Sequence, residues 1–110
     1  MSYKKKVVID TIRTVAFGAI TGAFGAVGAA LAAPARIFIL NNTTGQTLEM
    51  TTDGTNVQFI LPPRSFKLID ITANKANDTG FFIAEGTVFY VRHTGAAPAA
   101  GAVYVEIIRS

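Results

Sequence analysis

The sequence contains no cysteine and no tryptophan, and its only histidine is His93. Without cysteine the chain has no disulfide, no thiolate nucleophile, no iron–sulfur cluster and no cysteine-ligated zinc. One histidine leaves a single imidazole for any catalytic triad or histidine metal site. Charged residues make up only 15% of the sequence. These absences favour a binding or structural role over catalysis, and they leave the redox compartment open.

Hydrophobic residues make up half of the 110 positions, which excludes an intrinsically disordered chain. A chain of this length is the size of one domain and buries about two thirds of its unfolded surface. The net charge of +3 is concentrated at one end, because residues 1–13 carry four basic groups and one acidic group. Residues 14–110 carry six of each. A neutral body without a basic stripe predicts no specific nucleic-acid binding, whereas the basic end suits contact with an acidic surface.

Residues 14–35 form an uncharged segment of 22 positions, of which nine are Ala and four are Gly. Its length suits a membrane span, and its Ala-x-Ala triplets suit a secretory signal. Only six large apolar residues lie in it, so membrane insertion would be marginal. Their spacing of three and four residues suits a helix, but the glycines suit an extended, bulged strand packed closely against another backbone. We expect the extended form, with the helix as the alternative.

From residue 36 onward the pattern is that of short strands separated by turns. The strongest signal is a hairpin, in which residues 46–51 and 57–61 alternate polar and apolar side chains around Asp53-Gly54. Further strands are expected at residues 36–40, 65–72, 81–84, 87–93 and 102–108. In the strand at residues 65–72, apolar side chains fall on both faces. Strands at this spacing predict an all-β fold, a small jelly-roll-like β-sandwich.

The polar residues form no catalytic pattern. His93 lies at a strand end without an acidic residue within four positions, and we interpret it as an exposed or hydrogen-bonded strand-end histidine. Asp53 and Asp78 are interpreted as turn and loop residues, and Asp70 as a hydrogen-bonding strand residue. No calcium-loop motif and no phosphate-binding glycine motif occurs. We therefore expect no catalytic site, no metal site and no cofactor.

Two pairs of adjacent aromatic residues, Phe81-Phe82 and Phe89-Tyr90, lie in predicted strands. Neighbouring strand residues point to opposite faces, so one member of each pair is expected in the core and the other at the surface. Phe82 and Tyr90 are the expected exposed aromatic residues. They suit a protein interface or a sugar-stacking surface.

The runs ARIFILNNTTGQ, TTDGT, PPRSFKLIDITANK, EGTVFYVRHTG and GAVYVEII occur in this order between residues 35 and 108. In the order of its turns and strands, this region resembles the small β-sandwich decoration proteins of tailed bacteriophages. The likeness is to the stapling or cement proteins of epsilon15-type short-tailed phages. It covers about two thirds of the chain and includes no catalytic motif. It implies a compact jelly roll that forms homodimers and lies across junctions between major capsid proteins.

On this basis we expect two units, a docking arm at residues 1–33 and a β-sandwich body at residues 34–110. The expected function is a capsid decoration protein that is not an enzyme and binds the major capsid protein on the virion surface after assembly in the host cytoplasm. No membrane partner is expected. Alternatives are a collar, neck or fibre-base adaptor, and a membrane-anchored or secreted carbohydrate-binding sandwich. The expected capsid-contact residues of the arm are Lys4, Lys5, Lys6, Arg13, Phe17, Gly22, Phe24 and Gly25.

Overall fold

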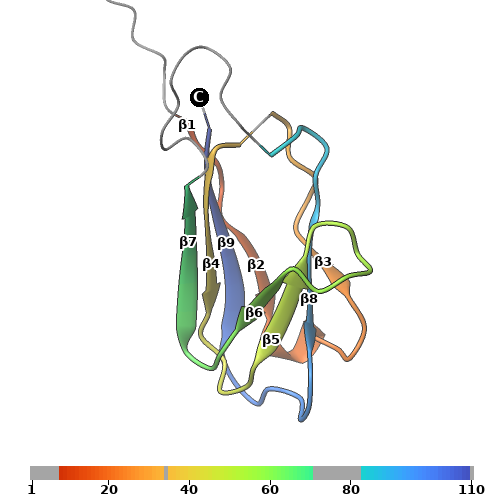
Figure 1. Cartoon of the computed structure of the whole chain (residues 1–110). Helices are drawn as coiled ribbons and strands as arrows, with labels where there is room; N and C mark the ends of the chain where they lie inside the picture. The colour runs from red at the N-terminus through yellow and green to blue at the C-terminus, as the bar shows by residue number, and fades with distance from the viewer. Residues whose placement is uncertain (1–7, 34, 71–82, 110) are drawn as a thin grey trace, which may run out of the picture.

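Two antiparallel sheets pack face to face in the computed structural model, which describes residues 8–33, 35–70 and 83–109 (Figure 1). In sheet A, β7 pairs with β4 and β4 with β9, while β1 and β2 both pair with the far side of β9. In sheet B the order is β3, β8, β5 and β6. The strands are β1 (Val8–Ile9), β2 (Arg13–Ala16), β3 (Gly25–Val27), β4 (Ile37–Asn42), β5 (Leu48–Thr51), β6 (Phe59–Leu61), β7 (Ser65–Asp70), β8 (Phe89–His93) and β9 (Ala102–Arg109).

The order of the strands is that of a jelly roll. Successive strands from β2 to β9 cross from one sheet to the other, except for β5 and β6, which form a hairpin within sheet B. As a result β2 lies beside β9 in sheet A, and β3 lies beside β8 in sheet B. Eight strands folded in this way are the double-sheet arrangement of two Greek keys. The structure therefore confirms the all-β sandwich that the sequence predicts.

The core lies between the sheets and is built from alternate residues of each strand. In β4, Phe38 and Leu40 point inward and are buried. The Phe38 ring packs against Phe89 at a centroid distance of 5.3 Å and against Phe59 at 6.0 Å, so both sheets contribute to the aromatic centre. The other buried residues of this packed core are Ile20, Val27, Leu31, Ala35, Leu48, Met50, Leu61, Val91, Val103, Val105 and Ile107.

The expected boundary between an arm at 1–33 and a body at 34–110 is wrong for residues 8–33. These residues supply β1, β2 and β3, and they place Ile20, Val27 and Leu31 in the core. Burial of a large aliphatic side chain contributes about 1.5–3 kcal/mol, so these three residues hold the segment against the body. The extended form of the segment is as expected, with one short 3₁₀ turn, η1 (Phe17–Ala19), after β2. Residues 1–7 lie outside the described residues.

A bulge separates β1 from β2 along the same edge of β9. Ile9 lies opposite Ile108 and Arg13 lies opposite Val105, so one extra residue is accommodated on the β1–β2 side. Such a bulge reverses the alternation of side chains. Ile9 therefore points to the outer face of sheet A, whereas Arg13 points toward the interior side. The described residues contain no helix long and apolar enough to span a membrane.

Asn42 joins two chain reversals at one end of the sandwich. Its side chain is fully buried, and its Nδ2 donates to the carbonyl oxygens of Gln46 (2.8 Å), Leu61 (3.1 Å) and Pro62 (3.1 Å). Its Oδ1 accepts hydrogen bonds from the backbone N–H and the hydroxyl of Thr44. Because an unpaired buried polar group is costly, this one amide fixes both the β4–β5 turn and the end of β6.

Candidate interaction surface

The outer face of sheet A carries an unusual number of apolar side chains. The register places Phe66 and Leu68 of β7 opposite Asn41 and Ile39 of β4, on the side of the sheet away from the core. An antiparallel sheet with one solvated face normally carries polar residues there. The outward positions across the sheet are Ile9, Thr14, Ala16, Ile37, Ile39, Asn41, Phe66, Leu68, Asp70, Ala102, Tyr104, Glu106 and Ile108.

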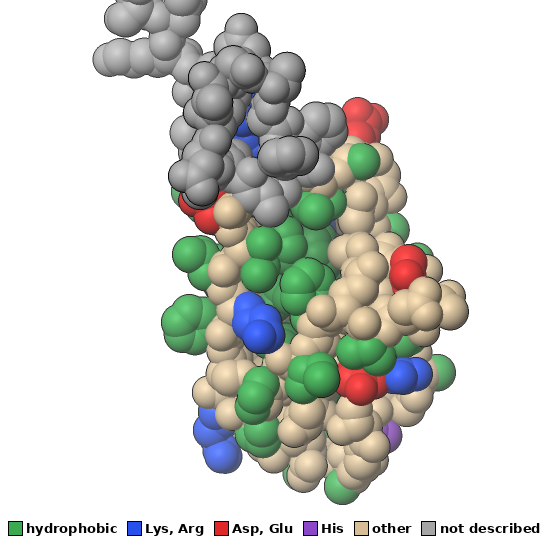
Figure 2. Space-filling view, in the orientation of Figure 1, with side chains coloured by type: hydrophobic (Ala, Val, Ile, Leu, Met, Phe, Trp, Pro, Cys, Tyr) green, Lys and Arg blue, Asp and Glu red, His purple; other side chains and the backbone are tan. Residues whose placement is uncertain are grey.

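Three of these apolar side chains are strongly exposed. Ile9 is 73% exposed, Phe66 is 67% exposed and Leu68 is 56% exposed. Figure 2 shows hydrophobic side chains projecting from the β7 margin of the molecule. Contiguous exposed apolar surface of this kind marks interaction sites in folded proteins. We call this outer side of sheet A, made of the outward positions given above, the apolar face.

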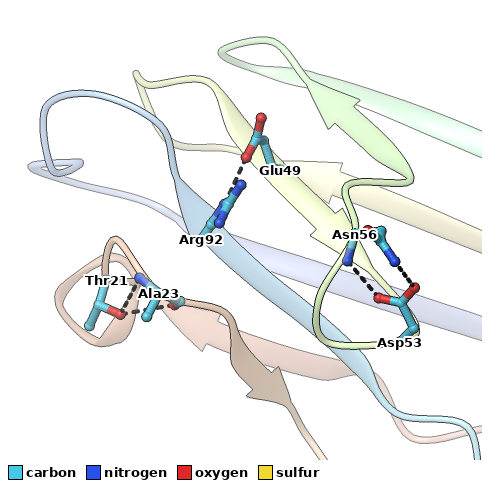
Figure 3. Close-up of polar contacts among 6 residues, drawn as sticks. All are labelled: Thr21, Ala23, Glu49, Asp53, Asn56 and Arg92. Atoms are coloured by element: carbon cyan, nitrogen blue, oxygen red, sulfur yellow. Dashed lines mark hydrogen bonds and ion pairs between the residues drawn. The ribbon is translucent and has the colours of Figure 1, made fainter.

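The outer face of sheet B differs, since its exposed polar and aromatic groups contact one another. Arg92 Nε donates to Glu49 Oε1 at 2.7 Å (Figure 3). The Arg92 guanidinium carbon also lies 4.3 Å from the centroid of the Phe24 ring. Tyr90 is half-buried against Gly54, where a Cβ would lie 3.5 Å from the ring. The ring surfaces that a sugar would need are thus partly covered by the chain itself.

The loop between β5 and β6 is organised by Asp53. Its Oδ1 accepts hydrogen bonds from the backbone N–H groups of Thr55 (2.7 Å) and Asn56 (2.8 Å) and from the Thr51 hydroxyl, and Asn56 Nδ2 donates to Oδ2 (Figure 3). These hydrogen bonds, that from the Asn56 backbone first, hold the pKa of Asp53 well below its ordinary value. Asp53 is therefore a loop-forming residue, as the sequence predicts, although the loop is longer than a two-residue turn.

A hollow of about 490 Å³ opens beside the bulge and is lined by residues 10–14 with Gly28 and Ala29. Within it Arg13 Nη1 lies 3.6 Å from Asp10 Oδ2, and Arg13 Nε donates to the Ala29 carbonyl at 3.1 Å. Both charged side chains are largely buried. Arg13 is thus engaged in holding β2 to the turn after β3, and its expected capsid contact stays a prediction.

The other residues expected to make contacts are spread over the molecule. Phe17 is exposed on η1, and Phe24 is half-buried against Arg92. Tyr90 lies on the outer side of sheet B. The structure does not bring these three together on the apolar face. Lys4, Lys5, Lys6 and Phe82 lie outside the described residues.

Within the described chain, no backbone lies close to Gly22 or Gly25, and their expected contact with the capsid stays a prediction. A Cβ on Gly25 would meet nothing within 4 Å, and one on Gly22 would meet only His93 at 3.7 Å. The tight positions are Gly101, where φ is +91° and a Cβ would lie 2.6 Å from the Thr43 carbonyl oxygen, and Gly28, where φ is +73° and a Cβ would lie 2.7 Å from Arg13 Cγ. Local sequence shows that glycine is frequent, but only the fold shows which glycine has a neighbour.

His93 lies at the end of β8, and its Nδ1 is buried without a hydrogen-bond partner in the described structure. The described residues contain no group of three or more His, Asp or Glu side chains placed to hold a metal ion. The backbone N–H of His93 donates to the Thr21 carbonyl at 2.9 Å, and a Cβ on Gly22 would lie 3.7 Å from His93 Cε1. Among the described residues, His93 thus belongs to no group of side chains that could hold a metal ion.

Comparison of the chain with protein-family models, with curated proteins and with solved structures finds no match. The function is therefore argued from the molecule's own surfaces. Among these, the apolar face is the feature that the fold itself does not require.

Proposed function

We propose that the protein is a capsid decoration protein of a tailed bacteriophage, which binds the outer surface of the head and staples neighbouring major capsid proteins. The observation that carries the proposal is the apolar face. A monomer in water gains nothing by exposing Phe66, Leu68 and Ile9, whereas a protein that docks on a large assembly gains free energy by covering them. The jelly roll and the resemblance in the order of turns and strands support the same role.

The physical basis of such a role is mass action. A ligand that binds the assembled lattice, but not its dissociated subunits, stabilises the lattice by its binding free energy. Many copies of a small rigid protein can stabilise the lattice in this way without catalysing any reaction. The proposal accordingly includes no enzymatic activity and locates the protein on the virion. It also includes a homodimer, which sedimentation velocity of the purified chain tests directly.

The test uses heads that lack the protein. Phe66→Ser combined with Leu68→Ser removes the most exposed part of β7 on the apolar face. Each side chain contributes about 1.5–3 kcal/mol when buried, so the pair is expected to lower affinity by about 100-fold or more in co-sedimentation. The control is Ile60→Ser, because Ile60 is 52% exposed but lies opposite Glu49 on the outer side of sheet B.

Equal binding by the β7 double variant and the wild type, with both folded in thermal melts, would remove the apolar face from the proposal. Failure of the wild-type protein to bind the heads would refute the decoration role itself. A collar or fibre-base adaptor would bind as well, but with a copy number far below that of the major capsid protein.

A further inference from the structure

Glu106 lies within the apolar face, away from its margins. It is on β9, which has β4 on one side and β1 and β2 on the other. Its cross-strand partner is Ile39, and the residues two positions away on the same side of β9 are Tyr104 and Ile108. Such neighbours along a strand lie about 7 Å apart. Glu106 thus places a carboxylate among apolar and aromatic side chains.

No group within residues 8–33, 35–70 and 83–109 pairs with this carboxylate. The described ion pairs are those of Arg13 with Asp10 and of Arg92 with Glu49, and Glu106 takes part in no described hydrogen bond. No Lys or Arg occupies an outward position of sheet A, where Asp70 is the other acidic residue. Glu106 consequently contributes nothing to the fold that a neutral residue of the same shape would not contribute.

The charge of the apolar face decides between two kinds of occupant. If a second copy docked the same face against this one, the two Glu106 carboxylates would enter one interface with no cation from the outward positions. An ionised group that loses water without gaining a partner is strongly unfavourable. A different protein avoids this cost by presenting a cation opposite Glu106.

We infer that the apolar face docks on a protein surface that is itself apolar and inserts one basic side chain, preferably arginine, against Glu106. Arginine suits the site because its guanidinium is planar, weakly hydrated and able to form paired hydrogen bonds with a carboxylate. Contact between two flat apolar surfaces supplies affinity but does not fix how the two proteins are positioned relative to each other. The buried ion pair fixes that position. The identity of this partner as a capsid protein rests on the proposed function.

The test compares Glu106→Gln and Glu106→Lys with the wild type in co-sedimentation with heads that lack the protein. The first substitution leaves the partner's cation without its anion and is expected to weaken binding about tenfold or more. Charge reversal is expected to weaken it about 100-fold or more. Glu85→Lys is the matched control, because Glu85 is exposed in the turn before β8 and outside the apolar face. Thermal melts of all variants are expected to match the wild type.

The outcomes separate the inference from the proposed function. If the wild type does not bind heads, both fail. A second outcome is that the wild type binds heads, the β7 double variant does not, and both Glu106 variants bind with wild-type affinity. The apolar face would then remain the docking surface, and the inferred basic side chain opposite Glu106 would be refuted. If sedimentation velocity shows a wild-type dimer that the β7 double variant converts to a monomer, the occupant of the apolar face is a second copy and the inference is overturned.

Discussion

Asn42→Ala is expected to destabilise the fold more than any substitution at the adjacent surface position. The wild-type amide bridges three carbonyl oxygens and one backbone N–H in a fully buried site. After the substitution, the Gln46 carbonyl retains the Thr44 hydroxyl and the Pro62 carbonyl retains the Ser65 hydroxyl. The loss therefore falls mainly on the Leu61 carbonyl and the Thr44 N–H.

Each buried polar group left unpaired costs about 1–3 kcal/mol, which gives a loss of about 2–6 kcal/mol for the two groups. A domain of this size shifts in Tm by about 4–8 °C per kcal/mol, so a decrease of about 10 °C or more is expected. The assay is thermal and urea unfolding followed by circular dichroism. Asn41→Ala is the control, because Asn41 points to the outer side of sheet A. Equal Tm values for the two variants would refute the role assigned to Asn42.

Three further predictions concern stability. Gly101→Ala is expected to lower the free energy of unfolding by roughly 2–3 kcal/mol, because it combines a positive φ with a clash against Thr43. Urea unfolding measures the effect, and Gly95→Ala is the control because Gly95 has open space around it. Leu31→Ala is expected to lower the free energy of unfolding by about 2–5 kcal/mol if the glycine- and alanine-rich segment belongs to the core. An unchanged Tm would indicate that the segment is an arm detached from the core. Asp53 has a lowered pKa, so its stabilising effect is present above about pH 4 and is lost as the pH falls further. Asp53→Asn is therefore expected to flatten the acid limb of a Tm–pH profile, and an unchanged limb would contradict this.

Local chemistry made the hairpin predictable from the sequence. The alternation on both sides of Asp53-Gly54 identifies two paired strands, and the structure pairs Leu48 with Leu61 and Met50 with Phe59. The same alternation placed Phe66, Leu68 and Asp70 on one side of β7. Apolar residues on both sides of that strand were the available signal for the apolar face. Their exposure became known only when the strand was found at the edge of sheet A.

Contacts between residues far apart in the sequence could not be predicted from the sequence. Val27 and Leu31 are surrounded in the sequence by small residues, which do not distinguish a buried side of the segment from an exposed one. The pattern therefore did not show that these two side chains complete the core. The bulge between Ile9 and Arg13 reversed the alternation and redirected Arg13 to Asp10 and Ala29. The apolar surroundings of Glu106 arise from neighbouring strands far away in the sequence. Each of these features depends on register, which propensity and spacing do not determine.

The decoration role is tested most directly by the amount of the protein in purified phage particles. Gel quantitation, or mass spectrometry with labelled standards, would compare the chain with the major capsid protein. The account predicts a copy number of the same order as that of the major capsid protein, and loss of the chain from particles that carry Phe66→Ser with Leu68→Ser. Absence of the wild-type chain from the particles would contradict it, as would a copy number that fits only a connector or a fibre base.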